Sequence, residues 1–145
     1  MTTVRVGVGC LVRNSLNKAV LIGRRKGSHG AGTLALPGGH LEMGETWEEC
    51  VSRELLEETN LSVTNIKYVG ATNDIAIGGN SNKHYVTIFM SADVATDSSP
   101  LENMEPHKCE EWMWKPWDEI VELSESNPEQ IFDPLLNFIR SGYTV

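Results

Sequence analysis

The segment "GGHLEMGETWEECVSRELLEETN", residues 38–60, contains seven of the 20 acidic residues of the chain. Arg53 is the only lysine or arginine in it. Like charges on neighbouring turns of a helix repel each other by roughly a few tenths of a kcal/mol per pair. This density of charge therefore requires either that the acids face water or that a cation lies among them.

The second half of this segment is predicted to form a helix from about residue 47 to residue 59. Thr46 suits the N-cap position, and Glu49 lies three residues later, which completes a capping box. Glu48 and Glu49 also lie near the positive end of the helix dipole, where acidic side chains are favoured. These two acids therefore have a structural explanation.

Two other acids lack that explanation. Glu54 and Glu58 project from the same helical face as Trp47 and Val51, whereas an amphipathic helix places acids on the opposite side. Burial of a carboxylate is costly unless it is paired or coordinates a metal, and its oxygens are the ligands that Mg²⁺ or Mn²⁺ prefers. Two interpretations stay open: a divalent-metal site, or a partly exposed helix end with solvated acids.

Arg53 lies beside these acids and can pair with Glu57 at i, i+4. It would hold the acids in place or supply positive charge near the site. The preceding loop, residues 38–45, contains three glycines, which permit positive φ and close approach of the backbone. A loop that ends at a helix N-terminus can present carbonyl groups to a metal and N–H groups to a phosphate.

Bulk properties limit the function classes. The chain has 145 residues, the size of one domain over residues 1–145, with 40% hydrophobic and 22% charged residues. Its net charge of −8 argues against indiscriminate binding to a nucleic-acid polymer. An anionic small molecule remains possible where the local field is positive or a metal bridges the charges.

Neither a membrane nor a disulfide framework is expected. No apolar run approaches the roughly 18 residues of a membrane span, and the start "MTTVRVGVGCLV" lacks signal-peptide features. The three cysteines are odd in number and widely spaced, without a CxxC pair. We therefore expect a reducing, cytoplasmic location.

The rest of the chain alternates between β-branched runs and turns. Strands are predicted over residues 3–13, 19–25, 33–37, 64–77, 84–94 and 110–117. With one helix in the middle and one at the end, this order favours an α/β or α+β sandwich around a mixed sheet.

The C-terminal helix is predicted over residues 127–142. Asn127 suits its N-cap, Pro128 suits its first turn and Gly142 suits its end. Pro134 lies inside this pattern and is expected to kink or divide the helix.

Residues 39–61 resemble the signature of the Nudix hydrolases. That signature is Gly, five residues, Glu, seven residues, Arg-Glu, an aliphatic, any residue, Glu-Glu, any residue, Gly and an aliphatic. The matching residues are Gly39, Glu45, Arg53, Glu54, Leu55, Glu57, Glu58 and Leu61. Asn60 replaces the expected glycine, and asparagine tolerates left-handed backbone, so the end of the helix should be kept.

The resemblance extends to "GRRKGSHGAGTLALPGGHLEMGETWEEC" and "NMEPHKCEEWMW". These segments are similar to small cytosolic nucleoside-triphosphate diphosphatases of the MutT-like branch, which act on oxidised or thiopurine nucleotides. The resemblance implies a Nudix α/β/α sandwich with a central mixed β-sheet, and commonly a homodimer. It implies Mg²⁺- or Mn²⁺-dependent hydrolysis of a nucleoside triphosphate, ordinary or oxidised like 8-oxo-dGTP, to a monophosphate and pyrophosphate.

Site roles also follow from the resemblance. Glu54 and Glu58 would be the main metal ligands. Glu57 would be a further ligand or would orient the attacking water, and the carbonyl of Gly38 is a plausible ligand. Glu45 would support the loop with Arg53 as its partner, or Arg53 would pair with Glu54. The implied catalytic set is Glu57, Glu58, Glu54 and Arg53.

Substrate contacts are expected outside the helix. Arg25, or else Arg24, would contact phosphate, because arginine binds phosphate oxygens in a bidentate manner; the alternative is an ordinary solvated loop. The expected substrate-binding set is Arg25, Arg24, Gly38, Gly39, Leu36 and Phe132. Four aromatic residues could stack on a base, although period-two tryptophans more often face a core or a dimer interface: Tyr85, Trp112, Trp114 and Trp117.

The last helix departs from the MutT-like pattern, whose members carry an aromatic pair that packs on the base. Phe132 is followed here by Asp133, which could accept from an amino group of a base or repel phosphates. Leu135 and Leu136 are expected in the core. Because of this departure, a prenyl or other diphosphate remains an alternative substrate, and a non-catalytic nucleotide-binding module is a further alternative.

Two remaining groups of residues are left without an assigned role. Four acids are candidates for an additional acid outside the helix, with solvated surface as the default interpretation: Glu102, Glu105, Glu110 and Glu111. The four histidines lack metal-ligand spacing and are unassigned: His29, His40, His84 and His107.

Overall fold

The computed structural model describes residues 3–14, 16–27 and 30–143. These residues form seven strands: β1 (Arg5–Arg13), β2 (Val20–Arg25), β3 (Leu34–Ala35), β4 (Gly38–His40), β5 (Val63–Asp74), β6 (Tyr85–Val94) and β7 (Cys109–Lys115). The helices are α1 (Trp47–Thr59), α2 (Trp117–Ser126) and α3 (Asp133–Arg140), with 3₁₀ turns η1 (Ile77–Gly79) and η2 (Pro128–Gln130).

The strands form one mixed sheet, as predicted. Its main order is β3-β2-β1-β6-β5, with β4 paired to β1 and β7 paired to β2. The pair β1–β6 is parallel, and the other pairs are antiparallel. The β1–β2 register is Arg13↔Val20, whereas β4 pairs with Gly7, Val8 and Gly9 of β1. Strands β2 and β4 therefore pair with different parts of the same edge of β1.

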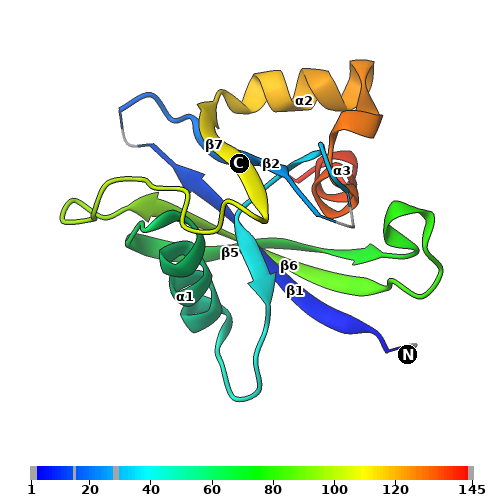
Figure 1. The fold of residues 1–145 in the computed structure, drawn as a ribbon, viewed down its shortest axis with the longest axis horizontal. Coiled ribbons are helices and arrows are strands. Elements are labelled where there is room, and N and C mark those ends of the chain that lie inside the picture. The colour runs from blue at the N-terminus through cyan, green and yellow to red at the C-terminus, as the bar shows by residue number, and fades with distance from the viewer. Residues whose placement is uncertain (1–2, 15, 28–29, 144–145) are drawn as a thin grey trace.

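Helices cover both faces of this sheet (Figure 1), with α1 on one side and α2 and α3 on the other. Alternation along β1 supplies both cores. Val8, Cys10 and Val12 pack with residues of α1, whereas Leu11 packs with residues of α2 and α3. The predicted α/β/α sandwich is confirmed.

Helix α1 has the predicted ends. The Thr46 hydroxyl accepts from the Glu49 N–H at 3.1 Å, and the Glu49 carboxylate accepts from the Thr46 N–H at 2.8 Å. At the other end Asn60 adopts φ 65° and ψ 5°, the left-handed conformation in which the signature has glycine. The capping box and the tolerance of asparagine at the helix end are both confirmed.

The predicted C-terminal helix is divided. Residues 128–130 form η2, Ile131 makes a parallel bridge to Leu34, and α3 begins at Asp133 with Pro134 in its first turn. Proline is tolerated there because the first N–H groups of a helix lack intrahelical partners. The expected Asn127 cap is wrong, since its side-chain amide bonds the Glu129 carboxylate at 3.1 Å.

Helix α2 was not predicted, and residue 117 was assigned to the preceding strand. The strand ends at Lys115, and Trp117 begins α2 after Pro116. The overlooked signal is helical spacing of buried or half-buried residues at Trp117, Ile120 and Ser124. Likewise, the predicted loop 38–45 begins with the short strand β4.

Two further observations bear on the sequence-based expectations. No helix in the described parts of the chain is long and apolar enough to cross a membrane. Cys10, Cys50 and Cys109 are buried free thiols.

Candidate active site

Acidic side chains of α1 line one cleft together with the glycines of β4. Glu54, Glu57 and Glu58 line it from α1, and Glu105 lines it from the segment before β7. Arg25, Leu36, Gly38 and Gly39 also line this cleft. The structure therefore brings together most of the residues that the signature and the loop were predicted to supply.

Among the acids that line the cleft, Glu58 is the one whose pKa burial raises most. Its carboxylate accepts a 2.8 Å hydrogen bond from the backbone N–H of Gly38. Burial raises its pKa to about 8, with the charges of Glu54 and Glu105 adding to the rise, while the hydrogen bond from Gly38 opposes it. A carboxyl group in this environment is stabilised in its charged form by a bound cation.

Glu54 lies against the backbone of β4. A Cβ atom added at Gly39 would lie 2.5 Å from the Glu54 carboxylate, so a larger residue would require Glu54 to leave this position. Burial raises the pKa of Glu54, and a 2.6 Å hydrogen bond from Arg53 opposes the rise. The prediction that Glu54 and Glu58 face inward agrees with these contacts.

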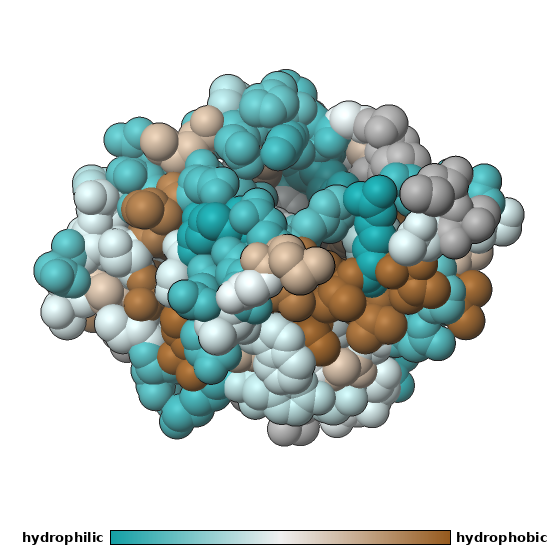
Figure 2. All heavy atoms as spheres, turned by 90° about the horizontal axis from the view of Figure 1, so that it is seen from below, coloured by the Kyte–Doolittle hydropathy of each residue, from teal (hydrophilic) through white to brown (hydrophobic). Residues whose placement is uncertain are grey.

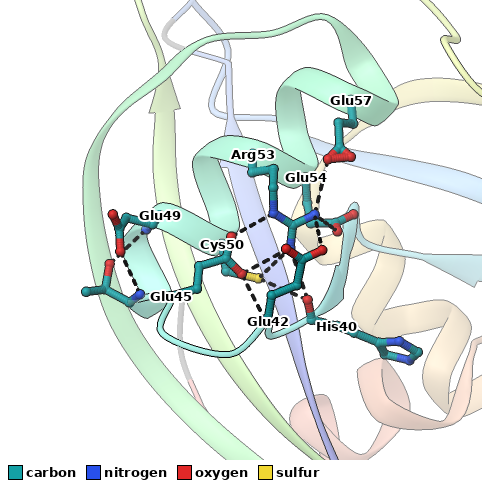
Figure 3. Close-up of polar contacts among 9 residues, drawn as sticks. His40, Glu42, Glu45, Glu49, Cys50, Arg53, Glu54 and Glu57 are labelled. Carbon is teal, nitrogen blue, oxygen red and sulfur yellow. Dashed lines mark hydrogen bonds and ion pairs between the residues drawn. The ribbon is translucent and has the colours of Figure 1, made fainter.

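Arg53 connects the acids (Figure 3). Its Nε and Nη2 atoms donate to the two oxygens of Glu45 at 2.6 and 3.0 Å. Its Nη1 donates to Glu54 and, at 3.1 Å, to Glu57. Nη2 also donates to the carbonyl of His40 at 3.1 Å, which ties α1 to β4. Both pairings considered for Arg53, with Glu45 and with Glu54, are present.

The contact between Glu45 and Arg53 shifts the pKa values of both groups. The hydrogen bond from Arg53 holds the pKa of Glu45 at about 2, against an ordinary value of 4.5. The same bond raises the pKa of Arg53. Because both groups stay charged at neutral pH, this pair fixes the start of α1 relative to the acids that line the cleft.

The donor set suits Mg²⁺ or Mn²⁺ in its chemistry. Glu54 and Glu58 offer carboxylate oxygens beside the backbone of Gly38. Within residues 3–14, 16–27 and 30–143, no three His, Cys, Asp or Glu side chains already converge as a metal cage. Mg²⁺ needs only one or two carboxylates, because it keeps several of its waters. The residues therefore fit such an ion.

The two adjacent arginines have different environments. The guanidinium of Arg25 lies 3.9 Å from the centre of the Phe132 ring and lines the cleft. Burial lowers its pKa, and the charge of Glu58 opposes this effect. Arg24 donates to the Gly32 carbonyl at 3.0 Å and pairs with Glu110 at 3.8 Å. The geometry favours Arg25, rather than Arg24, as the arginine directed at the site.

A second pocket, of about 180 Å³, adjoins the cleft on the α3 face of the sheet. Arg25, Leu36, Gly38 and Gly39 line both spaces. The pocket continues over the inward residues of β1 and β6 and beneath the start of α3: Gly7, Gly9, Tyr85, Thr87, Phe89, Phe132, Pro134 and Leu135. Gly7, Gly9 and Thr87 were not predicted; their only sequence signal is small or polar residues within apolar strands.

The aromatic candidates separate into two groups. Tyr85 lines the pocket, where its ring stacks on His40 and its hydroxyl lies 2.7 Å from the His40 Nε2 atom. Trp112 lines the cleft. Trp114 and Trp117 pack against the two cores instead.

The unusual acid of the last helix does not line the pocket. The Asp133 carboxylate accepts a 2.7 Å hydrogen bond from the N–H of Gly78 in η1. It therefore ties α3 to the β5–β6 connection, which was neither of the roles considered from sequence. Leu135 and Leu136 are buried, as predicted, and Leu135 also lines the pocket.

The candidate acids outside α1 and the histidines differ in whether they line the cleft. Glu105 lines the cleft, whereas Glu110 pairs with Arg24. Glu102 and Glu111 are exposed. His40 and His107 line the cleft and His84 contacts Asn73 at 2.5 Å, while His29 lies outside the described residues.

Parts of this chain are similar in sequence to known hydrolases. The NUDIX domain family model matches residues 3–135. A 43-residue segment, 30% of the chain, is 51% identical to the NAD-capped RNA hydrolase NudC of Vibrio cholerae and covers 16% of that protein. A 62-residue segment, 43% of the chain, is 40% identical to the 8-oxo-dGTP diphosphatase of Escherichia coli K12 and covers 47% of it. The chain thus matches less than half the length of either relative.

A solved structure extends the similarity to the whole fold. The MutT NUDIX hydrolase of Burkholderia pseudomallei superposes with a TM-score of 0.70 at 25% identity, covering 80% of this chain and 85% of that one. The prediction of a MutT-like Nudix hydrolase is confirmed at the level of the family: the chain belongs to the NUDIX domain family.

Proposed function

We propose that this protein is a divalent-metal-dependent hydrolase of nucleoside triphosphates, ordinary or oxidised, that releases a nucleoside monophosphate and pyrophosphate. The observation that carries the proposal is the position of Glu54 and Glu58 against the β4 glycines, in a cleft that Arg25 also lines. The 8-oxo-dGTP diphosphatase of E. coli supports an oxidised purine nucleotide as one substrate.

Mg²⁺, or Mn²⁺, would be held by Glu54 and Glu58, with Glu57 and the Gly38 carbonyl as further donors. Such an ion, when bound, supplies charge neutralisation and lowers the pKa of a coordinated water. Glu57 is half exposed, since 50% of its side chain is accessible, and it would orient or deprotonate the attacking water. Arg53 would act as a positioning residue that keeps Glu54 and Glu57 in place.

Arg25 would bind the phosphates where the cleft adjoins the second pocket. Its planar guanidinium lies between the acidic cleft and the second pocket, and such a group binds phosphate oxygens in a bidentate manner. Gly38, Gly39, Leu36 and Phe132 complete the proposed substrate-binding set. Phosphoryl transfer requires mainly positioning and charge stabilisation, which these residues provide.

We also propose a single domain over residues 1–145, a cytoplasmic location and a homodimer. Apolar side chains gather in a band on the face shown in Figure 2, among hydrophilic ones. Large exposed hydrophobic residues of the described chain include Val4, Val6 and Met43. These features support association of two copies, while the net charge of −8 argues against a nucleic-acid polymer or an anionic membrane as partner.

Pyrophosphate release from ordinary, 8-oxo and thio-substituted nucleoside triphosphates tests the proposed reaction. Turnover is expected with Mg²⁺ and should be absent when the metal is chelated. If none of these nucleotides is hydrolysed above the metal-free control, the proposed function is wrong.

A second candidate substrate is a prenyl or other non-nucleoside diphosphate. The apolar side chains that line the pocket, such as Leu36, Phe89 and Leu135, favour it. Values of kcat/KM for geranyl diphosphate and for nucleotides, measured side by side, decide between the two. A non-catalytic binding module would give no turnover with either, although it would still bind nucleotide.

A further inference from the structure

The pocket beneath α3 contains one hydroxyl group with an unusual environment, that of Thr87 in β6. Tyr85, Thr87 and Phe89 alternate along the strand and therefore face the pocket together. On the neighbouring strand Gly7 has no side chain, and a Cβ atom there would lie 3.9 Å from the Thr87 Oγ1 atom. The glycine thus leaves open space beside this hydroxyl group.

The hydroxyl group of Thr87 donates its proton in a hydrogen bond to a buried acid. Asp74 ends β5 with 0% exposure, and its Oδ2 atom accepts the Thr87 hydroxyl at 2.5 Å. Its Oδ1 atom accepts from the Asn137 side-chain amide of α3 at 2.9 Å. A carboxylate can only accept, and a hydroxyl group has only one proton to donate. Thr87 Oγ1 can therefore offer only lone pairs to a ligand.

The other polar side chains that line the pocket provide different chemistry. Tyr85 and His40 hydrogen-bond each other, while Arg25 and Lys83 are cations that donate. Thr87 therefore differs from these cations in presenting a fixed acceptor. A ligand atom that is itself an acceptor would leave two acceptors facing each other away from water, which is unfavourable.

We infer that Thr87, fixed by Asp74 and Asn137, is a specificity-determining residue that selects a heterocycle with an N–H group. That group is a ring N–H or an exocyclic amino group. The inference rests on the proposed function: if Arg25, which lines both spaces, binds the phosphates, the base of the nucleotide would enter the pocket. The preferred substrates are then nucleotides whose base has a hydrogen-bond donor on the edge that faces β6. Bases with a carbonyl group or an unprotonated nitrogen on that edge should be poorer substrates.

Substrate pairs that differ in one donor test this inference. Suitable pairs are GTP and ITP, which differ in the 2-amino group, and ATP and purine riboside triphosphate, which differ in the 6-amino group. The wild-type protein should prefer the member with the extra N–H group in at least one pair, by about tenfold in kcat/KM. Thr87→Ser should keep that preference, because serine retains the hydroxyl group.

Three variants then isolate the acceptor. Thr87→Val is nearly isosteric, removes the acceptor and should reduce the preference to about twofold or less. Asp74→Asn can donate to Thr87, which frees the threonine proton for the pocket, so the preference should weaken or invert. Thr72→Val is the matched control: Thr72 pairs with Thr87 across β5 and β6 and is buried, but it does not line the pocket, and its hydroxyl has no hydrogen-bond partner among the described residues.

The possible outcomes separate this inference from the proposed function. If nucleotides are hydrolysed but no pair is discriminated, or Thr87→Val keeps the preference, the inference is wrong and the function stands. If Thr87→Val melts well below the wild-type protein, its kinetics are not comparable and Asp74→Asn becomes the test. An unchanged substrate preference in Asp74→Asn then overturns the inference. If no nucleotide is hydrolysed, calorimetric binding of GMP and IMP to wild type and Thr87→Val is decisive, and equal affinity ratios overturn it.

Discussion

The backbone N–H of Gly38 donates a 2.8 Å hydrogen bond to the carboxylate of Glu58 and so joins β4 to the last turn of α1. Only glycine permits this contact, because a Cβ atom at position 38 would overlap the carbonyl oxygen of Val8 in the paired strand β1. The glycines that precede the helix therefore act by letting the sheet approach the acids.

Gly39→Ala is expected to damage catalysis through Glu54. The added Cβ atom would lie 2.5 Å from the Glu54 carboxylate, which must then move. Displacement of a reacting group by about 1 Å can reduce the rate about 10²-fold, so we expect a fall in kcat of that order. Gly7→Ala is the comparison: its Cβ atom would make ordinary contacts of 3.6–3.9 Å in the pocket and should act on KM instead. Equal effects of both variants on kcat would contradict this account.

Arg53→Lys should destabilise the protein although the charge is kept. Lysine cannot reproduce the two bonds to Glu45 together with those to Glu54 and Glu57. The free energy of unfolding should fall by about 1–3 kcal/mol, as measured by urea denaturation. Arg140→Lys, at an exposed position in α3, should change it by less than about 0.5 kcal/mol. An unchanged midpoint for Arg53→Lys would show that the network adds no stability.

The Glu45–Arg53 pair predicts a specific loss of stability in acid. The pKa of Glu45 is about 2 in the folded protein and 4.5 without the contacts. A lowered pKa stabilises the fold above pH 4.5, and this contribution is lost as the pH falls from 4.5 towards 2. Glu45→Gln should therefore have a shallower dependence of melting temperature on pH in this range than the wild-type protein. Glu48→Gln, at an exposed position in the first turn of α1, should keep the wild-type slope.

Arg25→Ala should weaken substrate binding more than Arg24→Ala does. Arg25 lines both the cleft and the pocket, whereas Arg24 contacts the Gly32 carbonyl and Glu110. Loss of charge-assisted bonds to phosphate typically costs about 1.5–3 kcal/mol, or roughly 10- to 150-fold in kcat/KM. Steady-state kinetics with one nucleotide compare the two variants. A larger loss for Arg24→Ala would reverse the assignment.

Much of the site was predictable because its determinants are local in sequence. The capping box at Thr46, the left-handed end at Asn60 and the inward face of Glu54 and Glu58 all lie within one short segment. Periodicity and capping rules apply directly to such a segment. The positions of the acids of α1 can therefore be predicted from the sequence of residues 38–60 alone.

The rest of the site depends on contacts between distant segments. Asp74 accepts hydrogen bonds from Thr87 and from Asn137. Both bonds form only because β5, β6 and α3 pack together in the fold. Nothing in the sequence near any of these residues indicates the other two. Asp133 shows the same limitation, since its partner Gly78 lies in η1, 55 residues away. Helix α2 was missed for a different reason: the period-two pattern of β7 continues in the sequence as far as Trp117.

Glu58→Gln tests the central claim, that the acids at the end of α1 serve metal-dependent hydrolysis. Glutamine keeps the shape of the side chain and can accept from the Gly38 N–H, but it lacks the charge. With saturating nucleotide and Mg²⁺, pyrophosphate release should fall by about 10²-fold or more, whereas Glu48→Gln should remain close to the wild-type rate. Hydrolysis by Glu58→Gln at the wild-type rate would contradict both the metal assignment and the proposed function.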